Sequence, residues 1–405
     1  MPKKTLYLLQ SWTRVFCPHF YYFPFNSSSN GIFTSKPFEC IRNLSIFLFF
    51  DPLLNFFAFF LGGRRNFGRT LVILVTAYLV WFVLILYMCL IPRRYIAWKQ
   101  CAILQHATKC EANTERFWFI CHLLLSHWLL FLVFFHYFCA VFKHAGRVPL
   151  ILPSNLPSVT ICARCVRPRP IRAHHCVVCG ECVLRMDHHC PWIANCVGLH
   201  SHRHFYLALC FMSVGGLYML TVGRWEFQVH ITEFERELST SEKVNAGSKS
   251  ITSWSHFGQS YYRRLHRVSS CCFIFGLIAI PLVMVLCMWQ SILVSRGETS
   301  IEHHTNIRFT QQFERRGLIY HNPFDCGLLL NWIQFLNLFS PMEIHHPSSK
   351  INVHSLYFYS LLSWRMLSRI LLPLAPSDIE TGVTYRLNIP DAQTVLDSLS
   401  ALDCE

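Results

Sequence analysis

The sequence predicts an α-helical polytopic membrane protein with four transmembrane helices and a cysteine-rich domain between the second helix and the third. Hydrophobic residues make up 53% of the 405-residue chain and charged residues only 14%, well below the roughly 25% usual for soluble domains. Four uncharged apolar runs are long enough to cross a bilayer. Seven cysteines fall between Cys162 and Cys196, after the second of these runs.

Residues 1–70 are predicted to form an N-terminal segment ahead of the first span. Within it, residues 44–61 are strongly apolar but contain Asp51, Pro52 and Asn55. This pattern favours an interfacial helix that lies in the bilayer surface, with a fifth span as the alternative.

The first predicted span, residues 71–91, is the clearest of the four. Its 21 uncharged residues cover about 30 Å as a helix, which is enough for the hydrocarbon core. Arg64 and Arg65 form a basic flank before it, and Arg93 and Arg94 close it.

The second predicted span, residues 117–142, carries three histidines, His122, His127 and His136. Histidines in lipid are costly unless they are neutral and partnered. Because these three do not share one helical face, we expect separate helix-packing or interfacial roles and no metal site in the membrane.

The third predicted span, residues 205–223, contains the small residues Ser213, Gly215 and Gly216. Small residues allow a neighbouring helix to approach closely or leave a gap. The fourth span, residues 271–294, contains Pro281, and a proline kink is tolerated in a transmembrane helix.

The formal net charge of +14 is compatible with a nucleic acid or with the anionic face of a membrane as partner. Because the Lys and Arg residues flank the apolar runs, the sequence favours the membrane and predicts no nucleic-acid partner. The same charge would attract a coenzyme that carries several phosphates.

The segment 143–204 contains the densest motif in the chain. It reads Cys162-x-x-Cys165, then His174-His175-Cys176-x-x-Cys179-x-x-Cys182, then Asp187-His188-His189-Cys190, then Cys196. A Cys-x-x-Cys pair offers two thiolates from one turn to a tetrahedral zinc ion. Three such pairs with histidines between them predict a zinc-binding domain and not a disulfide framework.

Counting possible ligands shows that some of these residues must have another role. Two structural zinc ions need eight ligands, and the segment offers seven cysteines and four histidines. A cysteine beside a histidine, with a carboxylate to orient that histidine, is the arrangement of a nucleophile, its base and an orienting group. Cys190, its neighbouring histidines and Asp187 fit this arrangement. From spacing alone, Cys190 could equally be one more zinc ligand.

The side of the membrane follows from the same cysteines. Thiols and zinc thiolates persist in the reducing cytosol, so the domain 143–204 is expected to be cytosolic. Four spans then place both termini, including the tail 295–405, in the cytosol, and the polar loop 224–270 in the lumen.

The motif Asp187-His188-His189-Cys190-Pro191-Trp192, inside this cysteine-rich frame, resembles the DHHC protein S-acyltransferase (palmitoyltransferase) family over about residues 68–335. Thr299-Ser300-Ile301-Glu302 is similar to the family's Thr-Thr-x-Glu motif. Asn322-Pro323-Phe324-x-x-Gly327, followed by Asn331-Trp332, is similar to its C-terminal motif. The run 295–302 and the basic tail resemble the Abl-philin branch, which implies an endoplasmic reticulum membrane, with the Golgi as the alternative.

The resemblance implies two zinc sites and a catalytic centre. One zinc is held by Cys162, Cys165, His175 and Cys182, and the other by Cys176, Cys179, His189 and Cys196. Cys190 is then acylated, His188 acts as the base and Asp187 orients it, which leaves His174 outside both sites.

By the same resemblance, the donor is a long-chain acyl-CoA such as palmitoyl-CoA, and the acceptors are membrane-associated proteins with accessible cysteines. The acyl chain is expected between the four spans, with Trp192 near its thioester end. Gly215 and Gly216 could leave room for the far end of the chain and admit chains beyond sixteen carbons, and ordinary helix packing is the alternative.

Other features leave more than one interpretation open. Arg164, Arg167, Arg169 and Arg172 could contact coenzyme phosphates, although a solvated surface role is expected for each. The family's Asp-Pro-Gly after the second span is replaced by residues 143–146, which keep only the glycine. No role is predicted for residues 1–60 and 341–360, and a non-catalytic zinc-containing membrane scaffold is the alternative function.

Overall fold

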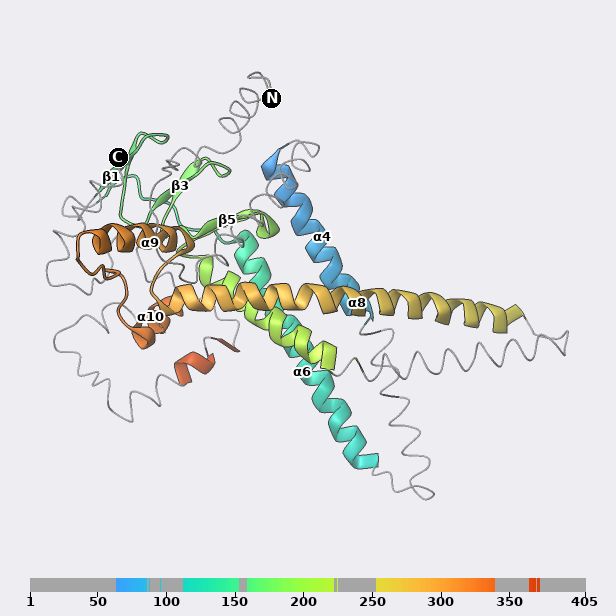
Figure 1. Cartoon of the computed structure of the whole chain (residues 1–405). Coiled ribbons are helices and arrows are strands. Elements are labelled where there is room, and N and C mark those ends of the chain that lie inside the picture. The colour runs from blue at the N-terminus through green and yellow to red at the C-terminus, as the bar shows by residue number, and fades with distance from the viewer. Residues whose placement is uncertain are drawn as a thin grey trace, which may run out of the picture. The chain divides into compact units, whose positions relative to one another are not determined.

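The computed structural model describes residues 63–85, 112–152, 159–221 and 253–338, with single positions or short stretches at 87, 95, 224, 364–368 and 370–371 (Figure 1). The predicted interfacial helix 44–61, the first half of the predicted lumenal loop and most of the tail lie outside these residues.

Long helices dominate the part of the chain that the structure describes. Three of them are long and apolar enough to cross a membrane, Asn113–Phe142, His202–Thr221 and Phe273–Ser295, and they coincide with the predicted second, third and fourth spans. The first belongs to α6 (Ala112–Phe142). Helix α4 (Arg64–Ile85) begins before the predicted first span and contains most of it.

Helix α8 (Ser253–Ser295) is longer than the predicted fourth span. Its 43 residues cover about 65 Å, whereas the hydrocarbon core needs about 30 Å. Its first turns occupy residues that we predicted to be loop. That prediction was wrong because polar composition alone does not distinguish a solvated helix from a loop. Pro281 lies inside the helix without ending it, as expected.

Three short antiparallel hairpins make up the cysteine-rich domain. They pair β1 (Thr160–Cys162) with β2 (Arg167–Arg169), β3 (His174–Cys176) with β4 (Glu181–Val183), and β5 (His188–Cys190) with β6 (Asn195–Val197). A lone two-stranded hairpin is marginal in water. Hairpins of three-residue strands therefore need another source of stability, and the cysteines and histidines that they carry are the natural one.

The connections within the first two hairpins are built around Cys-x-x-Cys pairs, as the β3–β4 turn shows. The N–H of Cys179 donates to the sulfur of Cys176 at 3.3 Å, and the N–H of Gly180 donates to the carbonyl of Cys176 at 2.8 Å. Gly180 has φ +75°, a left-handed conformation that glycine adopts without strain. The turn presents both sulfurs to the same side.

The region after α8 turns back onto the helix end. Helix α9 (Ser300–Arg315) begins at a capping box, and α10 (Leu328–Phe335) follows the Asn-Pro-Phe motif. The side chain of Asn331 donates to the carbonyl of Ser295 at 2.9 Å, and the indole N–H of Trp332 donates to its hydroxyl at 3.1 Å.

The histidines of the second span have separate partners. His122 Nδ1 lies 2.6 Å from the hydroxyl of Tyr218, and His136 Nδ1 lies 3.1 Å from His204 Nδ1. His127 contacts the hydroxyl of Tyr87. These contacts fit the packing roles that we expected from the sequence.

Candidate active site and metal centres

Two groups of metal-ligating side chains are present among the described residues. Their members are Cys162, Cys165, His175 and Cys182 in one group, and Cys176, Cys179, His189 and Cys196 in the other. The ligand atoms of each group lie within 4.8 Å of one another. These are the two sets that the family resemblance implies.

The separations within each group fit a tetrahedral zinc ion. The sulfur of Cys179 lies 3.4 Å from His189 Nδ1 and 3.5 Å from the sulfur of Cys196, and Cys176 lies 3.6 Å from His189. In the other group, His175 Nδ1 lies 3.2 Å from the sulfur of Cys165 and 3.9 Å from that of Cys182, and these two sulfurs lie 3.7 Å apart. Tetrahedral zinc–sulfur and zinc–nitrogen bonds require ligand–ligand distances of about 3.6–3.8 Å.

The β5–β6 hairpin explains why only one residue of the Asp187–Cys190 tetrad belongs to a metal group. His189 pairs directly with Cys196 across the hairpin, and both belong to the second group. Successive side chains of a strand point to opposite faces. His188 and Cys190 therefore share the face turned away from the metal ligands, and Cys190 is in neither group.

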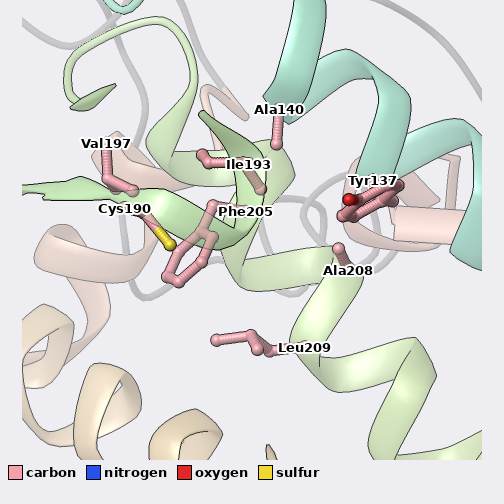
Figure 2. Close-up of a cluster of buried hydrophobic side chains, with 8 residues drawn as sticks. All are labelled: Tyr137, Ala140, Cys190, Ile193, Val197, Phe205, Ala208 and Leu209. Atoms are coloured by element: carbon pink, nitrogen blue, oxygen red, sulfur yellow. The ribbon is translucent and has the colours of Figure 1, made fainter. Parts of the chain in front are cut away.

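Cys190 lies in an apolar cluster where the hairpin meets two helices. Its side chain points toward the ring of Phe205 (Figure 2), and the residue is 4% exposed. The cluster contains Tyr137 and Ala140 of α6, Phe205, Ala208 and Leu209 of the helix His202–Thr221, and Ile193 and Val197 of the hairpin. The thiol is thus placed beside helices that are apolar enough to enter a membrane.

Asp187 and His188 form a close pair beside Cys190. His188 Nδ1 lies 2.7 Å from Asp187 Oδ2. Burial would raise the pKa of Asp187, but the hydrogen bonds and charges around its carboxylate hold the pKa well below its usual range. The pKa of His188 is raised to about 10, because hydrogen bonds to Asp187 and Cys190 outweigh burial, which would lower it.

Two residues that the sequence analysis did not connect with the site hold Asp187 in place. Ser300 donates to the carboxylate from its N–H at 2.6 Å and from its hydroxyl at 3.1 Å. Gln290 of α8 donates at 3.1 Å and also lies 2.8 Å from His202 Nε2. The sequence does carry one indication of the role of Gln290. A glutamine inside an apolar span needs a polar partner, because an unpaired polar side chain in lipid is costly.

The structure contradicts the expectation that Arg172 is a solvated surface residue, because its side chain is buried. It donates to both carboxylate oxygens of Glu302, at 2.6 and 2.7 Å, and its guanidinium lies 4.3 Å from the centroid of the Phe324 ring. The partner is 130 positions away, so no local pattern indicates it. Arg164 and Arg167 are exposed, as expected.

The motif Thr299–Glu302 links this ion pair to Asp187. Glu302 accepts a hydrogen bond from the N–H of Thr299 at 2.8 Å, and the hydroxyl of Thr299 accepts one from the N–H of Glu302 at 3.3 Å. Burial opposes the charge of Glu302, but Arg172 keeps its pKa low. The capping box fixes the start of α9 and holds Ser300 against Asp187.

The departure from the Asp-Pro-Gly sequence leaves the end of α6 well supported. The side-chain amide of Asn195 donates to the carbonyl of Ala140 at 3.0 Å and to that of Lys143 at 2.8 Å. Gly146 has φ +122°, so the glycine that remains is the residue that the backbone requires.

Trp192 and the two glycines of the third span occupy different surroundings. Trp192 is 53% exposed, and its carbonyl accepts a hydrogen bond from the hydroxyl of Tyr137 at 3.0 Å. A Cβ at Gly216 would lie 2.6 Å from Ile280 of α8, whereas a Cβ at Gly215 would meet no atom within 4 Å. Of these two glycines, Gly216 packs closely against α8 and leaves no gap there, which corrects the expectation for that residue, whereas the space beside Gly215 is open.

Comparisons with known proteins agree with this geometry. The model of the DHHC palmitoyltransferase family matches residues 157–307. The zebrafish palmitoyltransferase ZDHHC16A is 31% identical over 296 residues, which covers 68% of this chain and 72% of the relative. Palmitoyltransferase ZDHHC16 is 34% identical in mouse and 32% identical in human, with 68% of this chain covered in both cases and 68% and 69% of the relatives.

This chain belongs to the DHHC palmitoyltransferase family. The relatives confirm the Abl-philin resemblance seen in the sequence. The chain is therefore a membrane-bound protein S-palmitoyltransferase. As in other members of the family, its cysteine-rich DHHC domain carries Cys and His clusters that are compatible with zinc.

Proposed function

We propose that Cys190 is the cysteine that carries the acyl chain, with His188 as proton carrier and Asp187 as orienting group. One observation carries the proposal: Cys190 lies outside both metal groups and shares a strand face with His188. A thiolate is the reactive form of cysteine, and a cysteine held by zinc would not be free to attack.

In the first step the Cys190 thiolate attacks the thioester carbonyl carbon of a long-chain acyl-CoA. A new carbon–sulfur bond forms, and the bond to the coenzyme sulfur breaks. His188, protonated in the resting state because of its raised pKa, gives its proton to the leaving coenzyme thiolate. The products are acylated Cys190, neutral His188 and free coenzyme A.

In the second step a cysteine of a membrane-associated protein takes the acyl chain. Acylation removes the negative charge of Cys190, which is one of the causes of the raised pKa of His188. The pKa of His188 then falls, so the imidazole becomes a suitable base for the substrate thiol. Attack of that thiolate releases Cys190 as a thiolate and restores the resting state.

We assign the two zinc ions, when bound, a structural role. Each group supplies four protein ligands, which closes a tetrahedral site. The ions would hold three short hairpins in one arrangement and leave the acyl transfer to the residues of the chain.

We place the acyl chain among four membrane spans, with α4 as the first of them. Both termini and the DHHC domain lie in the cytosol, and the membrane is that of the endoplasmic reticulum. The apolar cluster around Cys190 (Figure 2) supports the placement of the acyl chain among the spans. Burial of an acyl chain against such side chains contributes about 0.8 kcal/mol per methylene. The exposed ring of Trp192 lies two positions after Cys190 and would contact the thioester end.

A pulse–chase experiment tests the two-step reaction. Purified enzyme is labelled with an alkynyl palmitoyl-CoA, and free coenzyme is removed. We expect a stable label that neutral hydroxylamine releases, and that moves to a cysteine peptide added afterwards. A non-catalytic scaffold would take up no such label, and direct transfer without an acyl-enzyme would stop once the donor is removed.

We further propose that Gly215 sets the maximum chain length, because the space beside its Cα is open. Gly215→Phe is expected to shift preference toward shorter acyl-CoA donors, with at least about a tenfold change in the ratio of kcat/KM values, since excluding a few methylenes forfeits over 1.4 kcal/mol. Gly215→Ala is the control and should keep the wild-type preference. An unchanged profile in Gly215→Phe would show that the gap serves helix packing alone.

A further inference from the structure

Two membrane-spanning helices, His202–Thr221 and α8, contact each other along an antiparallel seam. The hydroxyl groups of Tyr206 and Ser291 lie 3.0 Å apart, and the sulfurs of Cys210 and Cys287 lie 3.4 Å apart. A step of four residues forward in the first helix thus matches a step of four backward in the second. Four residues are about one turn of an α-helix, so the two helices pack side by side and the seam determines which polar side chains meet.

His202 and Gln290 meet where the first of these helices begins, and both are buried. His202 is 3% exposed and Gln290 is 1% exposed, and His202 Nε2 lies 2.8 Å from Oε1 of Gln290. At its other end, the amide nitrogen of Gln290 donates to Asp187 Oδ2 at 3.1 Å. Since both ends of the amide have a hydrogen-bond partner, its orientation is fixed.

These contacts also determine which nitrogen of His202 carries a proton. A carboxylate only accepts hydrogen bonds, so Gln290 must turn its N–H toward Asp187 and its carbonyl toward His202. Nε2 of His202 must then be the donor, because a carbonyl also only accepts. Its Nδ1 is buried and has no hydrogen-bond partner among the described residues. A proton on Nδ1 would be a buried donor without an acceptor, so the geometry assigns His202 as a neutral Nε2–H donor.

Gln290 is one of three side chains that donate to the same oxygen of Asp187. Oδ2 also accepts from His188 Nδ1 at 2.7 Å and from the hydroxyl of Ser300 at 3.1 Å. The three donors come from β5, α8 and α9, so the carboxylate is held from three different elements. Loss of one donor would let the carboxylate rotate, and the imidazole of His188 would turn with it. A small misplacement of a reacting group lowers the rate of a chemical step.

We propose that Gln290 and His202 are positioning residues for acyl transfer, and that they act through Asp187 on His188. The proposal rests on the role that the proposed function gives to Asp187. The Nε2–H of His202 sets the orientation of the Gln290 amide, the amide holds the carboxylate, and the carboxylate holds the imidazole. Their contribution is to the rate of the chemical step and not to binding of the acyl donor.

Gln290→Met tests the amide, because methionine has a similar length and shape but no N–H donor. We expect kcat for acyl transfer to fall about 10- to 100-fold, the range for loss of a hydrogen bond to a charged group. KM for palmitoyl-CoA and the zinc content should stay as in wild type. Ser291→Ala is the matched control, since it removes a hydrogen bond of the same seam that does not reach Asp187, and its kcat should stay within about twofold.

Two substitutions at His202 separate the hydrogen bond from packing. In His202→Gln the side-chain amide N–H takes the place of Nε2–H, so kcat should stay within about threefold of wild type. His202→Met has a similar length but no donor, and its kcat should fall about tenfold. A double-mutant cycle adds the link to the carboxylate. In an Asp187→Asn background, Gln290→Met should cause no further loss in the single-turnover rate of acylation.

Three results would each overturn the proposal. They are an unchanged kcat in Gln290→Met, equal rates in the two His202 variants, and a full additional loss from Gln290→Met in the Asp187→Asn background, which would indicate a packing role. If Gln290→Met loses zinc, the comparison of the two His202 variants decides. A wild-type rate in Asp187→Asn with its zinc intact would instead contradict the proposed function, so the two failures are distinguishable.

Discussion

Cys190→Ser is expected to abolish both the acyl-enzyme and acyl transfer to substrate while the protein stays folded. The hydroxyl of serine is not ionised near neutral pH, and the thiolate is the attacking group. Loss of a nucleophile of this kind lowers turnover by on the order of 10³-fold or more. Alkynyl palmitoyl-CoA labelling measures the acyl-enzyme, and zinc content by elemental analysis measures the state of the fold.

The fold should survive this change because Cys190 belongs to neither metal group and the oxygen of serine is smaller than sulfur. Cys121→Ser is the matched control, since Cys121 is also a free cysteine of the described region but lies outside the apolar cluster around Cys190. It should retain wild-type labelling. Loss of zinc from Cys190→Ser would instead identify Cys190 as a metal ligand, and the catalytic assignment would then be wrong.

Alanine substitutions of the adjacent residues His188 and His189 are expected to have different effects on acyl transfer and on zinc content. His188→Ala should retain both zinc ions and lower transfer by about 10²–10⁴-fold, the usual contribution of a positioned acid–base group. His189→Ala should lose the second zinc and with it the fold of the hairpins, because binding of a structural zinc contributes about 10–16 kcal/mol.

The physical reason is strand alternation: His189 lies opposite Cys196 in the second metal group, and His188 shares the other strand face with Cys190. Strand β3 offers the same contrast as a control. His175→Ala should lose the first zinc, and His174→Ala should keep both, because only His175 is a member of a metal group. Equal zinc content in His188→Ala and His189→Ala would contradict the assignment of faces.

Local features of the chain determined much of what the structure shows. The length of an apolar run is sufficient to indicate a membrane-spanning helix, so the second, third and fourth spans were predicted to within a few residues at their C-terminal ends. The hairpins were not predicted as strands. Spacing indicated a zinc domain but could not pair the ligands, and only the resemblance to a family gave the two sets that the structure brings together.

Position in the tertiary structure decided the rest. Arg172 looked like a surface residue because its partner Glu302 lies 130 positions away, and Gln290 was an unremarked polar residue until α8 placed it beside Asp187. Gly215 and Gly216 are equivalent in sequence, yet Gly216 packs against Ile280 and Gly215 faces open space. Periodicity and residue chemistry are properties of the chain itself. The partner of a buried charge, and the presence of a gap beside a glycine, depend on which distant segments packing brings together.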